Sequence, residues 1–184
     1  MKKWIIIGTI ALFLVGIYVA ISMLYPLMYS KENVAIQNDG VHFFMTPGKL
    51  KKIKGKPLKC DKYNIAPLMS YHYTEELYGY KAKSYYDFYT SFWGKWLSDV
   101  NIVIEDIELE DAKDLYEKVC ESLINYHSTR ERPANEYYYY NDDYDGEAEF
   151  SCSLGVKSNG SPEGISVYVT YKNGEFSLSA YYTF

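Results

Sequence analysis

The clearest pattern in the chain is the alternation of apolar and polar residues near its C-terminus. In ISVYVTYKNGEFSLSAYYTF, residues 165–184, two alternating runs flank Asn173-Gly174, a dipeptide that favours a two-residue hairpin turn. Setting Lys172 opposite Glu175 fixes the register of the whole hairpin. One face then pairs Tyr171 with Phe176, Val169 with Leu178, Val167 with Ala180 and Ile165 with Tyr182, and the other pairs Thr170 with Ser177 and Tyr168 with Ser179. Because one register sorts every pair, we predict two paired strands with one buried face.

Two further segments alternate in the same way. EAEFSCSLGV, residues 147–156, places Ala148, Phe150, Cys152, Leu154 and Val156 on one side, so we predict a strand with these residues inward. VNIVIED, residues 100–106, does the same with three apolar residues at alternate positions. The aromatic segment 58–98 fits two or three strands with uncertain ends.

Two short stretches carry helix signals. In MTPGKLKKIKGKP, residues 45–57, Thr46 is placed as the N-cap, Pro47 opens the helix, and Gly55 ends it. We expect Leu50 and Ile53 to pack against the core. A second helix follows Asp111, its expected cap, and ends near His127. Its apolar stripe comprises Ala112, Leu115, Tyr116, Val119, Leu123 and Tyr126.

The N-terminus is dominated by an uncharged run. After Lys2 and Lys3, no charged residue occurs between Trp4 and Ser30, and about 20 helical residues cross a membrane. The two lysines predict a cytoplasmic N-terminus. A cleaved signal sequence is the alternative, but its apolar region normally spans about 7–15 residues. We therefore predict a cytoplasmic stub at 1–3, a transmembrane anchor at 4–29, a linker at 30–40 and an extracytoplasmic domain at 41–184.

The predicted order of elements is helix, strands, helix, strands. Nothing between the two halves resembles a linker, and each half alone has few core residues. The sequence therefore predicts one α+β domain, an antiparallel sheet with two helices on one face. The order also suggests a degenerate structural repeat of two halves, although they share no evident identity.

The first helix also carries a resemblance. MTPGKLKKIKGKP, residues 45–57, resembles the short helix of small envelope proteins of the SmpA/OmlA type, which are similar in fold to the β-lactamase inhibitor protein. The resemblance covers these residues only, and it implies an extracytoplasmic protein-binding or assembly module without catalysis. This chain departs from the pattern because it has no cysteine before Cys60 to carry a lipid.

Charge and cysteine content exclude several function classes. Without Lys2 and Lys3, the chain has 17 lysines and arginines against 24 aspartates and glutamates, which gives a net charge of −7. Nucleic acids and anionic membrane surfaces attract basic patches, so neither is expected as a partner. Cys60, Cys120 and Cys152 allow at most one disulfide within the chain. Buried thiols are an equally good reading for any pair.

The acidic stretch NDDYDGEAE, residues 141–149, has two readings. Calcium loops place oxygen ligands at alternate positions before a glycine, which makes Asn141, Asp143, Asp145 and Glu147 candidate ligands, with Asp142 adding charge. Position twelve of such a loop falls on Cys152, where a glutamate belongs. We therefore favour a plain hairpin loop at 141–146 between two strands.

Catalytic signals are absent from the linear sequence. His42, His72 and His127 lie in no metalloprotease, nucleophile or phosphate-loop motif. No zinc spacing occurs among cysteines and histidines. The sequence thus predicts no cofactor and no enzyme activity, with a hydrolase whose site assembles from distant residues as a remaining alternative.

The aromatic residues of 71–96 are the candidate binding surface. Exposed tyrosine and tryptophan suit protein contacts and the stacking of sugar rings. The candidates are Tyr71, Tyr73, Tyr78, Tyr80, Tyr85, Tyr86, Tyr89, Trp93 and Trp96. We expect a single-pass membrane protein whose outer domain binds another envelope protein, with glycan or cell-wall binding as the alternative.

Overall fold

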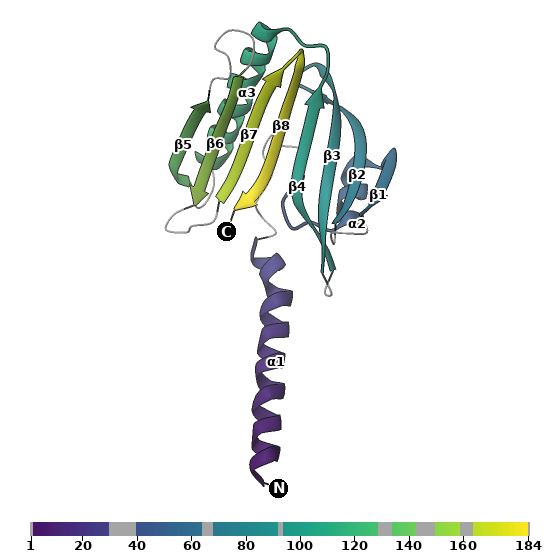
Figure 1. Ribbon diagram of the computed structural model, residues 1–184, viewed down its shortest axis with the longest axis vertical. Helices are drawn as coiled ribbons and strands as arrows, with labels where there is room; N and C mark the ends of the chain where they lie inside the picture. Colours follow the sequence, from purple (N-terminus) through teal and green to yellow (C-terminus); the bar gives the residue numbers. More distant parts are fainter. Residues whose placement is uncertain are drawn as a thin grey trace.

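The computed structural model describes residues 2–29, 40–63, 68–91, 94–128, 134–142, 150–158 and 164–183. It is an α+β protein with a long N-terminal helix and an antiparallel sheet (Figure 1). The helices are α1 (Lys2–Tyr29), α2 (Pro47–Lys54) and α3 (Leu109–Ser128). The strands are β1 (Lys59–Lys62), β2 (Leu68–Leu77), β3 (Tyr80–Ser91), β4 (Gly94–Ile104), β5 (Ala134–Asp142), β6 (Phe150–Ser158), β7 (Gly164–Lys172) and β8 (Glu175–Thr183).

The sheet consists of two meanders joined edge to edge. Its order is β1-β2-β3-β4-β8-β7-β6-β5, and every neighbouring pair is antiparallel. α2 precedes the meander β1–β4, and α3 precedes the meander β5–β8. The last strands of the two meanders pair with each other, from Asp99↔Tyr181 to Ile104↔Phe176. The two halves therefore share one topology, as expected of a degenerate repeat, and one continuous sheet unites them.

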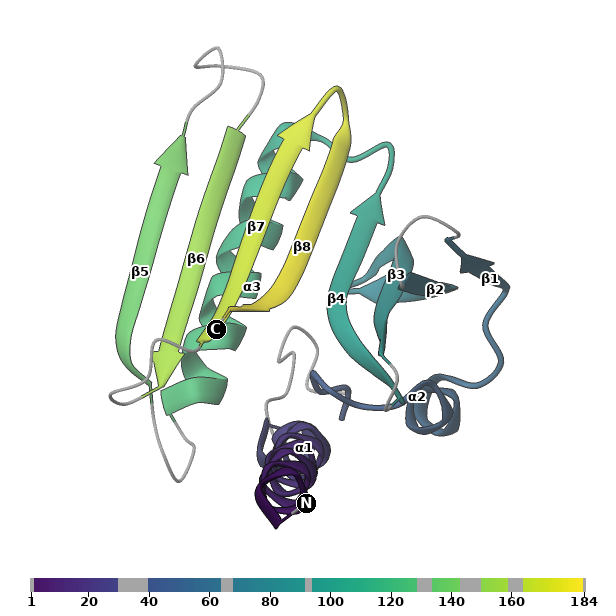
Figure 2. The same ribbon diagram turned by 60° about the horizontal axis from the view of Figure 1, so that its bottom comes forward.

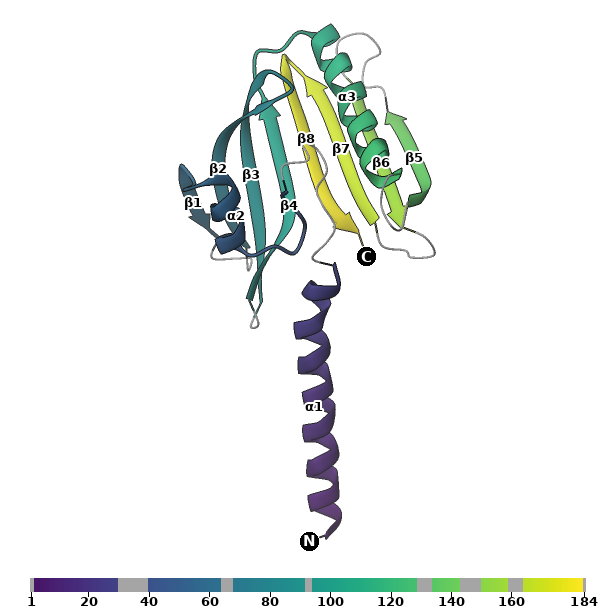
Figure 3. The ribbon, with the colours of Figure 1, turned by 180° about the vertical axis from the view of Figure 1, so that it is seen from behind.

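Both domain helices cover the same face of this sheet (Figure 3). Leu50 of α2 and Ala112, Leu115 and Val119 of α3 lie in one buried cluster with apolar residues of β2, β3, β4, β7 and β8. Figure 2 shows that α3 lies behind β6, β7 and β8. The prediction of two helices on one face is confirmed.

The C-terminal hairpin has the predicted register. Lys172 pairs with Glu175, and every pair from Tyr171↔Phe176 to Ile165↔Tyr182 is as expected. Asn173 (φ 52°) and Gly174 (φ 76°) both have positive φ, which the two-residue turn requires. Because the side-chain period of a strand is two, this turn decides which residues are buried.

α2 is built largely as predicted. Thr46 Oγ1 accepts a hydrogen bond from Lys49 N, Pro47 is at the start, and Gly55 N donates to Lys51 O at 2.9 Å. Leu50 is fully buried, but Ile53 is 43% exposed. The prediction that Ile53 packs in the core is therefore wrong, because so short a helix turns only one narrow face to the sheet.

α3 begins earlier than predicted. Its first residue is Leu109, and Ala112 N donates to Glu108 O at 2.9 Å, so Asp111 lies inside the first turn and is not the cap. The start is set by a distant contact, since Ile107 N donates to Gly174 O at 3.0 Å in the β7–β8 turn. Ala112, Leu115 and Val119 are buried as expected. Leu123 and Tyr126 lie beyond the described side chains of α3, which end at residue 122.

Part-way along strand β4, the set of alternate residues that point into the core changes. Leu97 pairs with Phe88, whereas Asp99 pairs with Asp87, so Ser98 is an extra residue in a β-bulge. Leu97 is buried, and the buried positions then continue at Val100 rather than at Asp99. A bulge of this kind re-aims the side chains that follow it. It explains why the alternating pattern in the sequence begins only at Val100.

α1 is one helix of 28 residues that projects from the end of the sheet (Figure 1). Taken over the residues that the structure describes, none of the helices combines the length and apolar character that a membrane crossing requires. The helical part of the prediction for residues 4–29 is confirmed. Its transmembrane part is not supported by this finding and stays a prediction, since the side chains described in α1 are those of residues 6–20.

Candidate functional site

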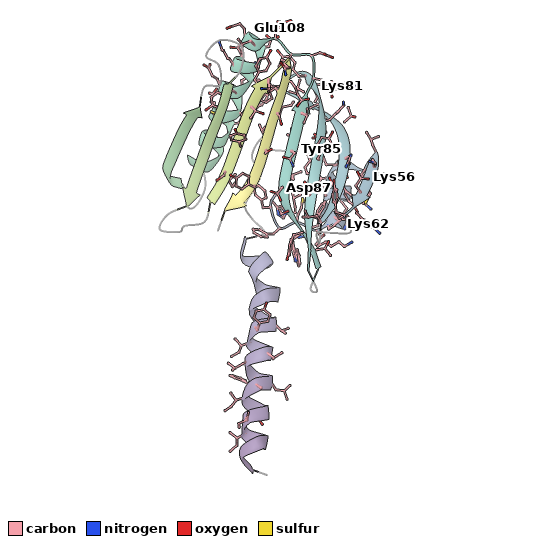
Figure 4. The ribbon with its side chains drawn as sticks, in the orientation of Figure 1. Lys56, Lys62, Lys81, Tyr85, Asp87 and Glu108 are labelled. Carbon is pink, nitrogen blue, oxygen red and sulfur yellow. The ribbon has the colours of Figure 1, made fainter. Side chains whose placement is uncertain are left out.

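The sheet has one face covered by α2 and α3 and a second face, which we call the open face. On β3 the residues Ala82, Ser84, Tyr86 and Phe88 are buried beneath the helices. The alternate residues Lys83, Tyr85, Asp87 and Tyr89 therefore lie on the open face. Figure 4 labels Tyr85 and Asp87 among the side chains of this region.

A polar row crosses the open face at its centre. The strand registers align His72 with Tyr85, Tyr85 with Asn101, Asn101 with Ser179, and Ser179 with Tyr168. Ser179 Oγ donates to Asn101 Oδ1 at 2.6 Å, across the joint between the two meanders. The rings of His72 and Tyr85 meet edge to face with centroids 4.8 Å apart. The row therefore draws residues from both halves of the domain.

An adjacent row places two carboxylates together. The registers align Ser70 with Asp87, Asp87 with Asp99, and Asp99 with Tyr181. Burial and then the neighbouring Asp99 charge raise the pKa of Asp87, while a hydrogen bond from Ser70 and the nearby His72 lower it. Asn101 Nδ2 also lies 3.5 Å from Asp87 Oδ2. Asp87 is thus a partly desolvated acid beside a second one, an arrangement that favours the approach of a cation.

His72 lies on β2 close to Asp87 of this acidic pair. Its Nε2 lies 3.2 Å from Asp61 Oδ2, yet that nitrogen makes no well-aligned hydrogen bond to a protein atom. The Asp61 carboxylate also receives Lys59 Nζ at 2.8 Å. Over the residues that the structure describes, no group of three or more histidine, cysteine or acidic side chains is arranged to hold a metal ion.

Aromatic rings lie within and beside the two rows. Tyr89 is 50% exposed, and Tyr168 and Tyr181 are 37% and 39% exposed. The Trp96 ring packs on the backbone of Gly94, where an added Cβ would come within 2.9 Å of the ring. The open face thus combines aromatic rings with amide, hydroxyl and carboxylate groups. This combination suits a ligand that carries a positive charge or polar groups and that can also stack on a ring.

The structure divides the predicted aromatic surface. Tyr71, Tyr73 and Tyr86 are buried beneath the helices and form part of the core, because they occupy the covered face of β2 and β3. Tyr80 is half-buried and packs against that core. Tyr85, Tyr89 and Trp96 lie on the open side of the sheet, and Trp93 lies outside the described residues.

Tyr78 has a separate role. It occupies the β2–β3 turn with φ 48°, beside Gly79 with φ 93°. Its hydroxyl contacts Ser122 Oγ and donates to Lys118 O at 3.4 Å. Because both of these residues belong to α3, Tyr78 connects the first meander to the helix of the second.

The calcium candidates fall mostly beyond the described part of the chain. Asn141 and Asp142 belong to β5 and pair with Cys152 and Ser151 of β6. β5 therefore continues two residues into the predicted loop, and its pairing with β6 confirms the hairpin. Asp143, Asp145 and Glu147 lie outside the described residues. The side chain of Cys152 is not among those described, so its inward orientation stays a prediction.

Among the side chains that the structure describes, the remaining cysteines and histidines share no site. Cys60 is a free thiol exposed on β1, and Cys120 is buried in α3. His42 Nδ1 lies 2.9 Å from the adjacent Phe43 O. His127 lies in α3 beyond its described side chains.

Sequence reasoning missed the acids and the second-half tyrosines of the open face. Asp87, Asp99 and Asn101 come together only through strand pairing and the β4 bulge. Tyr168 could have been found, because the hairpin register already set it with Ser179 on the polar face. Tyr181 needed the β4–β8 pairing, which no local pattern reveals.

Comparison with known proteins finds no protein-family model that matches the chain. The search of curated proteins also finds no match.

Proposed function

We propose that this chain is a membrane-anchored, extracytoplasmic binding module without catalysis, and that its open face receives a basic segment of a protein partner. The observation that carries this proposal is the pair Asp87 and Asp99, set among exposed rings on a sheet face that neither α2 nor α3 covers.

The anchor is supported by α1. Its 28 residues span about 42 Å at about 1.5 Å per residue, and the hydrocarbon core of a membrane is about 30 Å thick. Leu12 is 76% exposed and Phe13 68% exposed, so these side chains require an apolar environment other than the domain. Lys2 and Lys3 favour an inward N-terminus, which leaves the sheet domain outside.

The choice of a basic partner rests on charge. Beside the two rows, the ammonium group of Lys59 is already bound to Asp61. The hydrogen-bonding partners described for Asp87 are the neutral groups of Ser70 and Asn101, and the nearby His72 also lowers its pKa. A lysine or arginine side chain placed there would meet two carboxylates and the faces of tyrosine rings. Cation–π contacts contribute about 0.5–2 kcal/mol each, more as they lose water.

A glycan is the second candidate, because one observation favours it. The hydrogen-bonded pair Ser179–Asn101 lies beside the half-exposed ring of Tyr168, in the same row. A sugar ring could stack on Tyr168 while its hydroxyl groups bond to the amide and hydroxyl. The same geometry therefore serves a neutral ligand without using the acid pair.

The test is site-specific photo-cross-linking of the full-length chain in its membrane. A photoreactive side chain replaces Tyr89 on the open face, and the matched control replaces Tyr63, which is 53% exposed against 50% for Tyr89 but follows β1. We expect a cross-linked protein at position 89 and none at 63. Asp99→Asn should abolish the product, and Glu110→Gln on exposed α3 should leave it unchanged.

The outcomes separate the two candidates. If the position-89 product persists in Asp99→Asn, the basic-partner proposal is refuted. If no protein is captured and soluble cell-wall fragments shift the intrinsic fluorescence of wild type but not of Tyr168→Ser, the glycan candidate replaces it. Equal capture at positions 63 and 89 would refute the assignment of the open face.

A further inference from the structure

The two edges of the sheet are built differently. β1, at one edge, has four residues, and two of them are lysines, Lys59 and Lys62. β5, at the other edge, has nine residues, ANEYYYYND, with four consecutive tyrosines and no lysine or arginine. Short edge strands and lysines are devices that prevent edge-to-edge pairing. β1 has both of these devices and β5 has neither, although the pairing of β5 with β6 shifts register between Ala134 and Glu136, so only Glu136–Asp142 forms a regular edge.

The backbone of β5 is paired on one side only within the described chain. Its pairing with β6 runs from Ala134↔Ser158 to Asp142↔Ser151, and no described helix or strand lies beyond it (Figure 2). At about 3.4 Å per residue, nine residues present an edge of about 30 Å. Along such an edge, every second residue directs its backbone N–H and C=O away from the sheet.

We propose that β5 pairs antiparallel with β5 of a second copy of this chain, joining two sheets across a two-fold axis. This inference goes beyond the binding function proposed above and does not depend on it. The domain already contains one joint of this kind, since β4 and β8 unite its halves through six antiparallel pairs. The β5 edge would repeat that joint between copies.

Charge selects the antiparallel direction. Parallel in-register pairing would set Glu136 opposite Glu136 and Asp142 opposite Asp142 of the second copy, and directly opposed like charges are destabilising. Antiparallel pairing centred on Tyr138 instead sets Glu136 opposite Tyr140, and it places Asp142 near the uncharged residues Ala134 and Asn135, where β5 shifts register. Tyr137 then meets Tyr139, a cross-strand aromatic pair. Centring the axis between Tyr138 and Tyr139 also avoids every acid–acid pair.

The strand β1 of a second copy is a poorer occupant. It supplies only four residues, against nine in β5. A β1–β5 contact is also head-to-tail, and it would build an open chain of copies rather than a closed pair. The native thiol of Cys60, exposed on β1, reports directly on that alternative.

The first test is disulfide trapping in the full-length chain with Cys60→Ser as background. Residues at a two-fold axis face their own copies with Cα atoms about 4.5–5.5 Å apart, within the range that a disulfide spans. Tyr138→Cys should give a covalent dimer under mild oxidation, and Tyr139→Cys should do so as well if the axis lies between these two residues. Asn135→Cys, on the same strand, should give no covalent dimer. Position 135 lies three residues from the axis in each copy, so the two introduced cysteines are about 20 Å apart along the strands.

The second test measures mass without cross-linking. Sedimentation of the full-length chain in detergent should show a dimer. Tyr138→Lys should raise the dissociation constant of this dimer at least tenfold. Tyr63→Lys, a tyrosine exposed beyond β1, is the matched control and should leave the dimer unchanged. A circular dichroism spectrum like that of wild type for Tyr138→Lys separates loss of pairing from loss of fold.

Several results would overturn the proposal. These are a monomeric wild-type chain, disulfides at Asn135→Cys as abundant as at the two axis positions, or a dimer that survives Tyr138→Lys. A disulfide between Cys60 and Tyr138→Cys, in a chain that keeps the native cysteine, would assign the β5 edge to β1 and refute the closed pair.

Discussion

A nearly buried ion pair attaches α2 to the sheet, and its removal should destabilise the fold measurably. Lys54 Nζ lies 3.0 Å from Glu75 Oε2, and the two side chains are 13% and 11% exposed. Tyr86 donates its hydroxyl to the same carboxylate at 3.0 Å. Lys54 also lies over the Tyr86 ring, 5.8 Å from its centroid. One carboxylate on β2 therefore holds groups from α2 and β3 together.

The perturbation is Glu75→Leu, which removes the shared acceptor and keeps an apolar side chain in its place. Removing one partner of a buried pair costs about 3–5 kcal/mol. Because the side chains of Lys54 and Glu75 retain some exposure, we expect the lower end, about 3 kcal/mol. The double variant Lys54→Met/Glu75→Leu should recover more than about 1 kcal/mol of that loss, since replacing both partners leaves no ammonium to desolvate.

The assay is urea unfolding of the full-length chain in detergent, followed by tyrosine and tryptophan fluorescence. A loss of about 3 kcal/mol lowers the midpoint by about 1–3 M for slopes of about 1–3 kcal/mol/M. The control is Glu110→Leu, which removes the exposed pair with Lys113 and should cost less than about 1 kcal/mol. Equal losses for Glu75→Leu and Glu110→Leu, or a double variant worse than Glu75→Leu, would refute the reasoning.

Three further predictions concern stability. Burial raises the pKa of Tyr73 from 10.0 to about 12. The unfolded chain therefore releases this proton at lower pH than the folded chain, and the free energy of unfolding should fall between pH 10 and 12. Tyr73→Phe should make this fall with pH less steep in unfolding curves, and an unchanged dependence on pH would contradict the burial argument. Gly174→Ala places a Cβ at φ 76° and should cost about 1–2 kcal/mol, read from the urea midpoint. Thr46→Ala removes the α2 cap and should cost about 1 kcal/mol by the same assay, whereas Thr46→Ser should cost less.

Local sequence signals were reliable where a turn or cap decides the structure. Asn173-Gly174 predicted the whole register of the β7–β8 hairpin, because positive φ at both residues admits few alternatives. Thr46, Pro47 and Gly55 predicted both ends of α2. In each case the deciding interaction lies within a few residues, so no distant contact was needed.

The same reasoning was weaker in the aromatic segment. Tyrosines lie on both faces of β3, and side-chain type does not distinguish Tyr86 in the core from Tyr85 on the open face. Only the sheet pairing and the position of the helices assign them. The start of α3 was likewise misplaced, because the contact of Ile107 with the distant Gly174 precedes the helix.

The sequence by itself determined the helical N-terminus, the α+β class, the helix–strands–helix–strands order and the final hairpin, since each depends on hydrophobic period or turn chemistry over a few residues. The tertiary structure decided which strands lie side by side. Pairing β4 with β8 brings Asn101 to Ser179, and the bulge at Ser98 turns Asp99 to face Asp87. These contacts join residues far apart in the chain, and a one-residue shift in register would separate them. The candidate site is therefore a property of the sheet, whereas its turns and caps are properties of the sequence.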